Sequence, residues 1–195
     1  MDCYCLLFVD YDALDLMGPV EMLQHAGASL HYVSQHGGLV RSRAGFEVMT
    51  TALKELPAQA LLLVPGGQGT RALVQDVHFL QALRQWVAQA HTVLSVCTGA
   101  ALLAATGALD GLRATSNKKA FAWVQGCGPQ VLWQPRARWV QAGKFHTSSG
   151  VSAGMDMALA FIAERCGLEE ARRIARHCEY LWSENPQDDP FAAPL

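Results

Sequence analysis

The chain has 195 residues, of which 51% are hydrophobic and 16% charged, as is typical of one globular domain and not of a disordered chain. Fifteen Lys and Arg against seventeen Asp and Glu leave a formal charge of −2, which predicts no nucleic-acid or membrane partner. No apolar run approaches the ~20 residues of a membrane span, and no export signal is recognisable, so we expect a cytoplasmic protein with reduced cysteines.

Strand-length apolar runs alternate with helical patterns, which is typical of βαβ units around a mainly parallel sheet. In the first part of the chain we predict strands at 3–9, 30–34, 45–51 (half of a hairpin), 60–64 and 92–96, and helices at 15–26, 76–90 and 98–106. Further on we predict a helix at 118–124 capped by Asn117, a hairpin of 138–141 with 144–147, and helices at 151–166 and 169–180. Residues 1–195 are therefore expected to form a single domain, with 183–195 as its tail.

Cys97 stands between a buried strand and an Ala-rich helix, at the carboxyl edge of the predicted sheet. This placement predicts a nucleophile elbow with sulfur in place of a serine oxygen. The unpaired amides at the helix start favour a thiolate over a thiol. The alternative is that Cys97 is a small core residue beside a tight turn, because free cysteines are often simply buried.

Gly66 and Gly67 follow the neighbouring predicted strand, so they should reach the same edge of the sheet. Adjacent glycines leave their N–H groups open to a developing negative charge. Together with the amide of Thr98, they are candidate donors of an oxyanion hole. A Gly-Gly turn is common after strands, so its value depends on its pairing with Cys97.

Three more side chains are candidates for proton transfer. Asp15 and Glu21 follow the first strand, and the apolar neighbours of Asp15 predict a raised pKa that suits a proton donor. The alternative for Asp15 is a carboxylate that offsets the helix dipole. His146 is the candidate partner of a Cys–His pair, although its place at a strand end equally fits a structural histidine.

Four motifs in chain order resemble the ThiJ/PfpI superfamily: Asp15 to Pro19, Pro65 to Gly67, Ser95 to Ala100, and Thr147 to Asp156. The resemblance implies a flavodoxin-like three-layer sandwich, as in class I glutamine amidotransferase domains, and a homodimer. It covers nearly the whole chain, up to Tyr180. Within that superfamily, the Cys-Thr-Gly elbow and the Asp-Leu-x-Gly-Pro loop look most like isonitrile hydratases.

Isonitrile hydratases add water to an isonitrile to give an N-substituted formamide, so the resemblance implies a small-molecule substrate. It makes Cys97 the nucleophile on the terminal isonitrile carbon, Asp15 the proton donor and later water activator, and Thr98 a positioning residue. The acid of that family aligns with Asp15 and not with Glu21. We expect no cofactor and no metal ion.

The chain also departs from that pattern. Ala114 to Lys119 replaces the Thr-Thr-His-Trp usual in isonitrile hydratases, which puts the substrate in doubt. Thr98 stands where the peptidase branch has His, which argues against peptidase activity. Because no helix-turn-helix follows, a free-standing transcription regulator is not expected. Two alternatives stay open: a glyoxalase or deglycase acting on small aldehydes, and a redox-sensing or chaperone-like protein in which Cys97 is oxidised.

Overall fold

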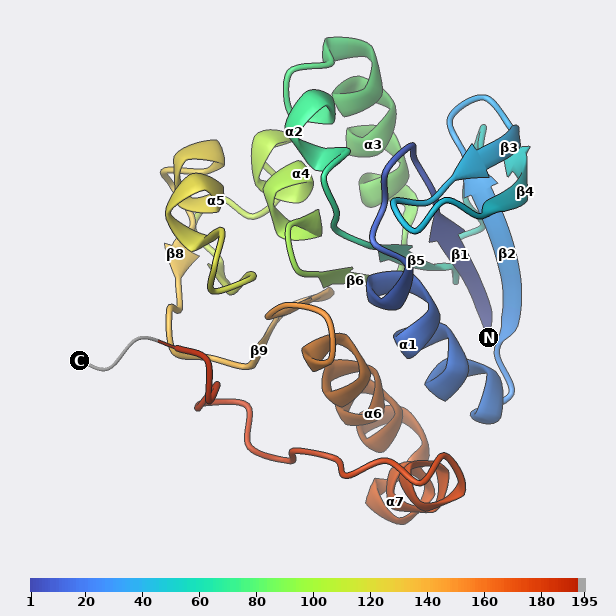
Figure 1. Ribbon diagram of the computed structural model, residues 1–195, viewed down its shortest axis with the longest axis vertical. Helices are drawn as coiled ribbons and strands as arrows, with labels where there is room; N and C mark the ends of the chain where they lie inside the picture. Colours follow the sequence, from blue (N-terminus) through green and yellow to red (C-terminus); the bar gives the residue numbers. More distant parts are fainter. Residues whose placement is uncertain (193–195) are drawn as a thin grey trace.

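The predicted βαβ pattern forms a mixed, mostly parallel sheet in the computed structural model, which describes residues 1–192 (Figure 1). Within that range the main sheet has eight strands in the order β3-β4-β2-β1-β5-β6-β10-β9. Only the β3/β4 and β10/β9 pairs are antiparallel. The strands are β1 (Asp2–Leu6), β2 (Ser29–Ser34), β3 (Gly38–Arg41), β4 (Glu47–Ala52), β5 (Leu61–Val64), β6 (Thr92–Val96), β9 (Trp139–Ala142) and β10 (Phe145–Ser148).

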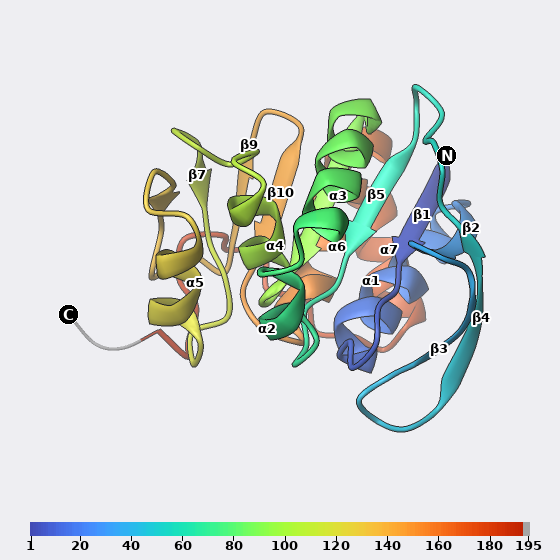
Figure 2. The same ribbon diagram turned by 90° about the horizontal axis from the view of Figure 1, so that it is seen from above.

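Helices cover both faces of this sheet, which gives the three layers of an α/β sandwich (Figures 1 and 2). One face carries α1 (Ala13–His25), α6 (Ala153–Cys166) and α7 (Leu168–His177), which pack on one another. The other face carries α2 (Thr70–Leu73), α3 (Val77–Gln89) and α4 (Gly99–Ala105), with α5 (Phe121–Cys127) beside α4. The predicted α/β class is confirmed. No helix within residues 1–192 is long and apolar enough to cross a membrane.

The predicted strands and long helices are confirmed to within a few residues, and the differences have local causes. The predicted helix after Asn117 begins later, at Phe121, because the Asn117 side chain accepts the Ala120 N–H and so caps the turn before the helix. Three elements are too short to leave a periodic pattern: the four-residue helix α2 and the two strands of a small sheet, β7 (Arg113–Ala114) and β8 (Leu132–Trp133). Residues 193–195 of the predicted tail lie outside the described range.

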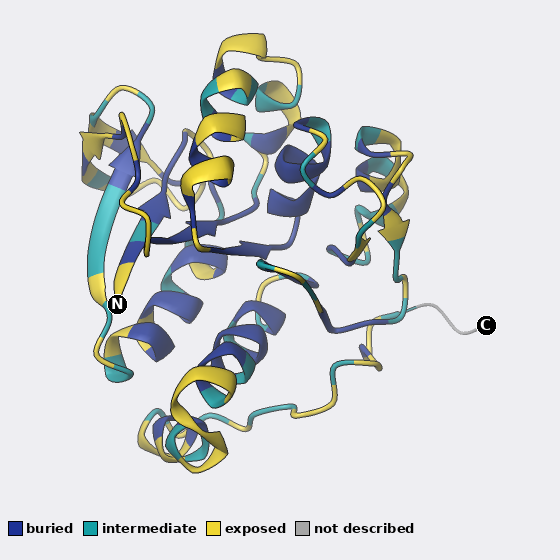
Figure 3. Ribbon diagram, turned by 180° about the vertical axis from the view of Figure 1, so that it is seen from behind, coloured by how far each residue is buried: buried dark blue, intermediate teal, exposed yellow. Residues whose placement is uncertain are grey.

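The core is deepest where helices cover the sheet on both sides (Figure 3). Every residue of β5 and β6 is buried, which explains why both strands are almost uninterrupted apolar runs. Helix α4 is likewise buried along nearly its whole length, which explains its Ala-rich sequence. A helix with small side chains can lie close to the sheet, so the two residues that connect β6 to α4, Cys97 and Thr98, lie between two buried elements.

The strand order brings three loops to one place on the carboxyl edge of the sheet. The chain winds from β1 to β2 in one direction and from β5 through β6 to β10 in the other, so the order reverses between β1 and β5. Ligands of open α/β sheets bind at such a reversal. Gly66 and Cys97 lie in the loops after β5 and β6, and Asp15 lies in the first turn of α1, just after the loop that follows β1.

Candidate active site

Cys97 occupies a strained turn between β6 and α4. Its φ is +57°, a left-handed conformation that costs a non-glycine residue about 1–3 kcal/mol. The turn is held from both sides, because the Cys97 N–H donates to the carbonyl of Ser149 (3.1 Å) and the Ser116 hydroxyl donates to the Cys97 carbonyl (2.7 Å). The backbone geometry therefore confirms that Cys97 lies on a sharp turn between a strand and a helix.

Asp15 lies in the first turn of α1 and is fully buried. Its Oδ2 accepts the Gly66 N–H at 3.0 Å. Burial raises its pKa to about 7, and the nearby charge of Asp12 adds to the rise, whereas hydrogen bonds from Gly66, the Cys97 thiol and the Val151 amide oppose it. The prediction of a raised pKa at Asp15 is confirmed, with loss of solvent as its main cause.

Cys97 is a buried thiol with a carboxyl neighbour. Only 8% of the residue is exposed, and this burial, together with the negative charge of Asp15, raises the pKa of the thiol far above its usual range. The amide of Thr98 acts in the opposite direction. The expectation of a thiolate stabilised by the helix start is therefore wrong for this structure. The amide at the start of the seven-residue α4 lowers the pKa of the thiol by less than burial and the Asp15 carboxylate raise it.

The two glycines after β5 hold the acid and the hydroxyl of the site. The Gly66 N–H donates to Asp15, and the Gly67 N–H donates to the Thr98 Oγ1 at 3.0 Å. Both amides thus have acceptors already, and an oxyanion would have to displace a side chain to use them. A Cβ on Gly66 would lie 2.6 Å from the Thr98 nitrogen and 2.8 Å from the Asp15 Oδ2, so no larger residue fits there.

The structure does not bring Glu21 or His146 to this site. Glu21 is exposed and bonds to His25 at the other end of α1. His146 lies on β10 with its ring against Phe161, and its Nε2 is 4.0 Å from a carboxylate oxygen of Glu164. Burial lowers the pKa of His146. Neither residue can exchange a proton with Cys97 from these positions.

Val151 also contributes to the site, a role that its residue type did not indicate. It has a φ of +48°, unusual for a β-branched residue, and its amide hydrogen-bonds Asp15. The preceding Gly150 packs so tightly that an added Cβ would overlap the Asn117 amide. Val151 lies within the Thr147 to Asp156 motif, but the motif alone does not indicate that the backbone N–H of Val151 is the group that contacts Asp15.

A cavity of about 560 Å³ lies beside Val151, where the chain departs from the isonitrile hydratase motif. It is lined by Asn117, Lys118, Lys119, Ser149, Gly150, Val151, Ser152 and Phe191. Burial lowers the pKa of Lys118 to about 8, and its Nζ donates to the Thr115 hydroxyl. This cavity adjoins the backbone that holds Asp15 and Cys97, so it is the candidate entrance for a substrate.

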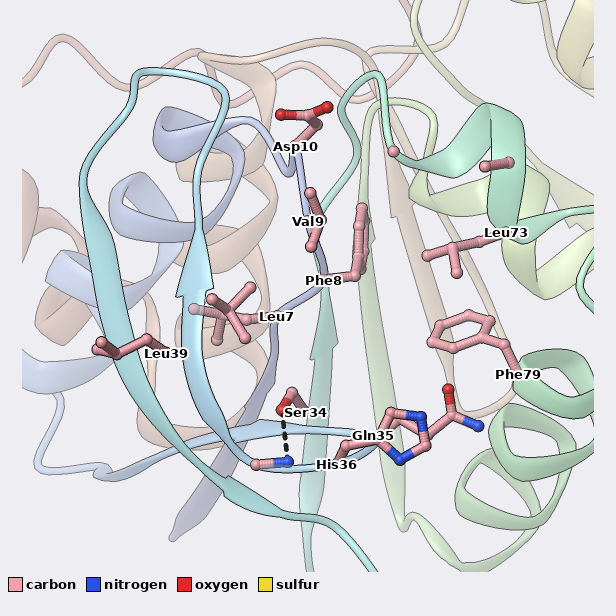
Figure 4. A pocket seen from close by; sticks show the side chains of 14 residues that line it. Leu7, Phe8, Val9, Asp10, Ser34, Gln35, His36, Leu39, Leu73 and Phe79 are labelled. Carbon is pink, nitrogen blue, oxygen red and sulfur yellow. Dashed lines mark hydrogen bonds between the residues drawn. The ribbon is translucent and has the colours of Figure 1, made fainter.

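A second cavity, of about 390 Å³, lies at the end of β1 near the β3/β4 hairpin (Figure 4). Apolar side chains such as Phe8, Leu73 and Phe79 surround it, and Ser34 is hydrogen-bonded to the Gly37 amide at its rim. None of the residues that line it is Cys97 or a neighbour of Cys97 in the site. It is therefore a separate cavity.

Comparison with known proteins places this chain in a family. The DJ-1/PfpI family model matches residues 1–164. The isonitrile hydratase of Pseudomonas putida is 33% identical over 177 residues, which cover 90% of this chain and 76% of that protein. The HTH-type transcriptional regulator GbdR of Pseudomonas aeruginosa is 32% identical over 193 residues, which cover 94% of this chain but only 52% of the regulator. A THiJ/PfpI family protein from Pseudomonas syringae has the same fold, with a TM-score of 0.81 and 30% identity over 100% of this chain and 78% of that one. The chain thus belongs to the DJ-1/PfpI family.

Proposed function

We propose that this protein is a cysteine-dependent isonitrile hydratase, which adds water to a small isonitrile and releases an N-substituted formamide. The observation that carries the proposal is the buried Cys97–Asp15 pair, in which a protonated thiol contacts a carboxyl group whose pKa is about 7. The similarity to the isonitrile hydratase of Pseudomonas putida supports the same reaction.

The pair suits the chemistry of an isonitrile because the terminal carbon of R–N≡C must gain both a nucleophile and a proton. The sulfur of Cys97 forms a bond to this carbon, while the thiol proton passes through the Asp15 carboxylate to the same carbon. The product is the thioimidate Cys97–S–CH=N–R. A free thiolate is not needed at rest, since the proton that it would have lost is used in the reaction.

Hydrolysis of the thioimidate regenerates the site. Asp15 takes one proton from the attacking water, whose oxygen bonds to the former isonitrile carbon, and delivers it to the imine nitrogen. The remaining hydroxyl proton then passes through Asp15 to the departing sulfur as the C–S bond breaks and the C=O bond forms. The product is R–NH–CHO, and Cys97 is again a thiol. The Thr98 N–H, which faces the sulfur, stabilises the negative charge on it as it leaves.

A turnover assay tests the proposal. The wild-type chain and the Cys97→Ala and Asp15→Asn variants are incubated with para-nitrophenyl isonitrile, and the formamide is measured. Loss of all activity in Cys97→Ala and a loss of about 100-fold or more in Asp15→Asn are expected. Cys166→Ala is the matched control, because Cys166 is an exposed thiol at the end of α6 and should leave turnover unchanged.

The same preparations separate the alternative functions. Cys97-dependent loss of methylglyoxal without formamide would replace the proposal with a glyoxalase or deglycase. Inertness toward both compounds, with ready oxidation of Cys97 to a sulfinic acid, would replace it with a redox sensor. The raised pKa of the Cys97 thiol argues against the sensor, because oxidation follows the thiolate fraction.

We also propose that the working form is a homodimer, as the resemblance implies. An exposed apolar pair on the edge hairpin supports this, since Leu39 and Met49 are cross-strand partners that are 60% and 66% exposed. Light scattering on the eluted chain should give twice the chain mass of 21.1 kDa, and Leu39→Glu with Met49→Glu should shift it toward the monomer. A monomer at all concentrations would refute the proposal.

A further inference from the structure

Three potential metal ligands gather where the C-terminal ends of α1 and α7 meet, away from Cys97, and a second histidine lies beside them. Glu21 and His25 are one helical turn apart on α1, with Oε1 and Nε2 3.1 Å from each other. The Cys178 sulfur comes from the residue that ends α7. The ligand atoms of these three residues all lie within 4.8 Å of one another. The ring of His177 packs against that of His25, with centroids 4.4 Å apart.

We infer that Glu21, His25 and Cys178, with His177 as the fourth ligand, form a binding site for a borderline divalent metal ion such as Zn²⁺. A thiolate, two imidazoles and one carboxylate are donors that Zn²⁺ accepts in a tetrahedral arrangement. They come from two helices that both pack against α6, so the backbone positions are fixed before a metal arrives. No other group of three such ligands is present in residues 1–192.

For Glu21, His25 and Cys178 the distances require only small side-chain movements, whereas the exposed His177 lies outside the 4.8 Å group and has to turn its ring toward the ion. Bonds of about 2.0–2.3 Å in a tetrahedron place neighbouring ligand atoms about 3.3–3.8 Å apart. Glu21 and His25 are slightly closer than this, and the Cys178 sulfur has to move inward by about 1 Å from the 4.8 Å limit. Glu21 is exposed and His25 and Cys178 are half-buried, so their side chains have room to turn and the ion has a path from solvent.

The ligand set indicates a structural ion and not a catalytic one. Four protein ligands leave no open position for water or substrate. Asp15 is ten residues from His25 on α1, roughly 15 Å along the helix, so the metal would not touch the Cys97 pair. A metal in this place would join α1, which carries Asp15, to α7 and would stabilise the folded chain by mass action.

Metal titration of the tag-free chain tests the inference. Zn²⁺ alone, in competition with a chromophoric chelator, is expected to bind with one ion per chain and to raise the unfolding temperature. Co²⁺ alone is expected to give the near-ultraviolet charge-transfer band of a thiolate ligand and visible bands of tetrahedral intensity. Cys178→Ser should abolish the charge-transfer band, and His25→Gln should weaken Zn²⁺ binding by about 100-fold or more.

Two controls locate the ion. Cys166→Ser and Cys97→Ala each remove a thiol outside the cluster and should leave the affinity and the Co²⁺ spectrum unchanged. Circular dichroism of each metal-free variant should equal that of the wild type, because all four side chains are at or near the surface. Stoichiometric Zn²⁺ binding that survives Cys178→Ser and His25→Gln, or that disappears in Cys97→Ala, would overturn the inference, as would the absence of binding. Glu21→Gln keeps the test valid if another variant misfolds, since it should also lower the affinity.

Discussion

The buried position of Asp15 makes its negative charge lower the free energy of unfolding. The pKa of its carboxyl is about 7 in the folded chain and 3.8 in the reference state. Between these two pH values the folded chain holds a proton that the unfolded chain has lost, so the free energy of unfolding falls as pH rises. The cost is complete above pH 7, where it amounts to about 4 kcal/mol at most.

Asp15→Asn should therefore stabilise the protein while it removes activity. In urea unfolding at pH 8, the variant is expected to have a higher free energy of unfolding than the wild type, by about 2–4 kcal/mol. At pH 4 the difference should nearly vanish, because the wild-type carboxyl is then protonated in the folded state. Equal stability of the two chains at pH 8 would show that burial of the Asp15 charge costs little.

The same group should control the pH dependence of catalysis. The step requires the Asp15 carboxylate to accept the thiol proton, so kcat/KM for the isonitrile should rise about tenfold per pH unit below pH 7 and level off above it. Asp15→Asn should lose this inflection as well as most of the rate. An unchanged inflection in Asp15→Asn would assign it to another group.

Cys97 and Asp15 could be predicted as site residues from the sequence, because each follows a recognisable apolar strand and so falls at the carboxyl edge of the sheet. It did not allow the ionisation of Cys97 to be predicted. That property depends on a carboxyl group 82 positions earlier in the chain and on burial by three loops. His146 was a reasonable candidate by residue type, yet the strand register gives it Leu94 as its partner and places its ring against α6.

At the scale of the elements, a buried arginine connects the residue that precedes β9 with α6 and the segment after α7. Arg138 Nε donates to the Asp156 carboxylate at 2.6 Å, and the other oxygen of Asp156 accepts from the Tyr180 hydroxyl and the Ser183 amide. Asp189 Oδ2 lies 3.6 Å from the guanidinium. The segment that follows α7 is thus anchored by charge, although its sequence shows no periodicity.

Arg138→Ala should destabilise the chain by about 3–5 kcal/mol, because it removes the ion-pair partner of the fully buried Asp156 carboxylate. Arg136→Ala is the matched control. It breaks an exposed pair with Asp188 of similar length, 2.7 Å, and should cost about 1 kcal/mol or less. Denaturant unfolding of both variants measures the difference. Similar small losses in the two would mean that the Arg138 network contributes no more than a surface pair.

At the scale of the whole molecule, the sheet and its two helical layers could be predicted because each long element satisfies its own period. The apolar run of β6, for example, matches the predicted 92–96. The four-residue hairpin partner β3 and the two-residue strands β7 and β8 could not be, since strands this short hold too few residues for an alternating pattern to stand out. Asp15, which follows β1, meets Gly66 and Cys97, which follow β5 and β6, because the strand order reverses between β1 and β5.

The most direct test of the central claim is the mass of the intact chain during turnover. We predict that rapid acid quenching with excess para-nitrophenyl isonitrile yields a species heavier by the whole mass of the isonitrile, with the added mass on the peptide that contains Cys97. The addition loses no atoms, so the increase should equal the substrate mass. Formamide production by the Cys97→Ala variant at the wild-type rate, with no adduct on Cys97 in the wild type, would contradict the account.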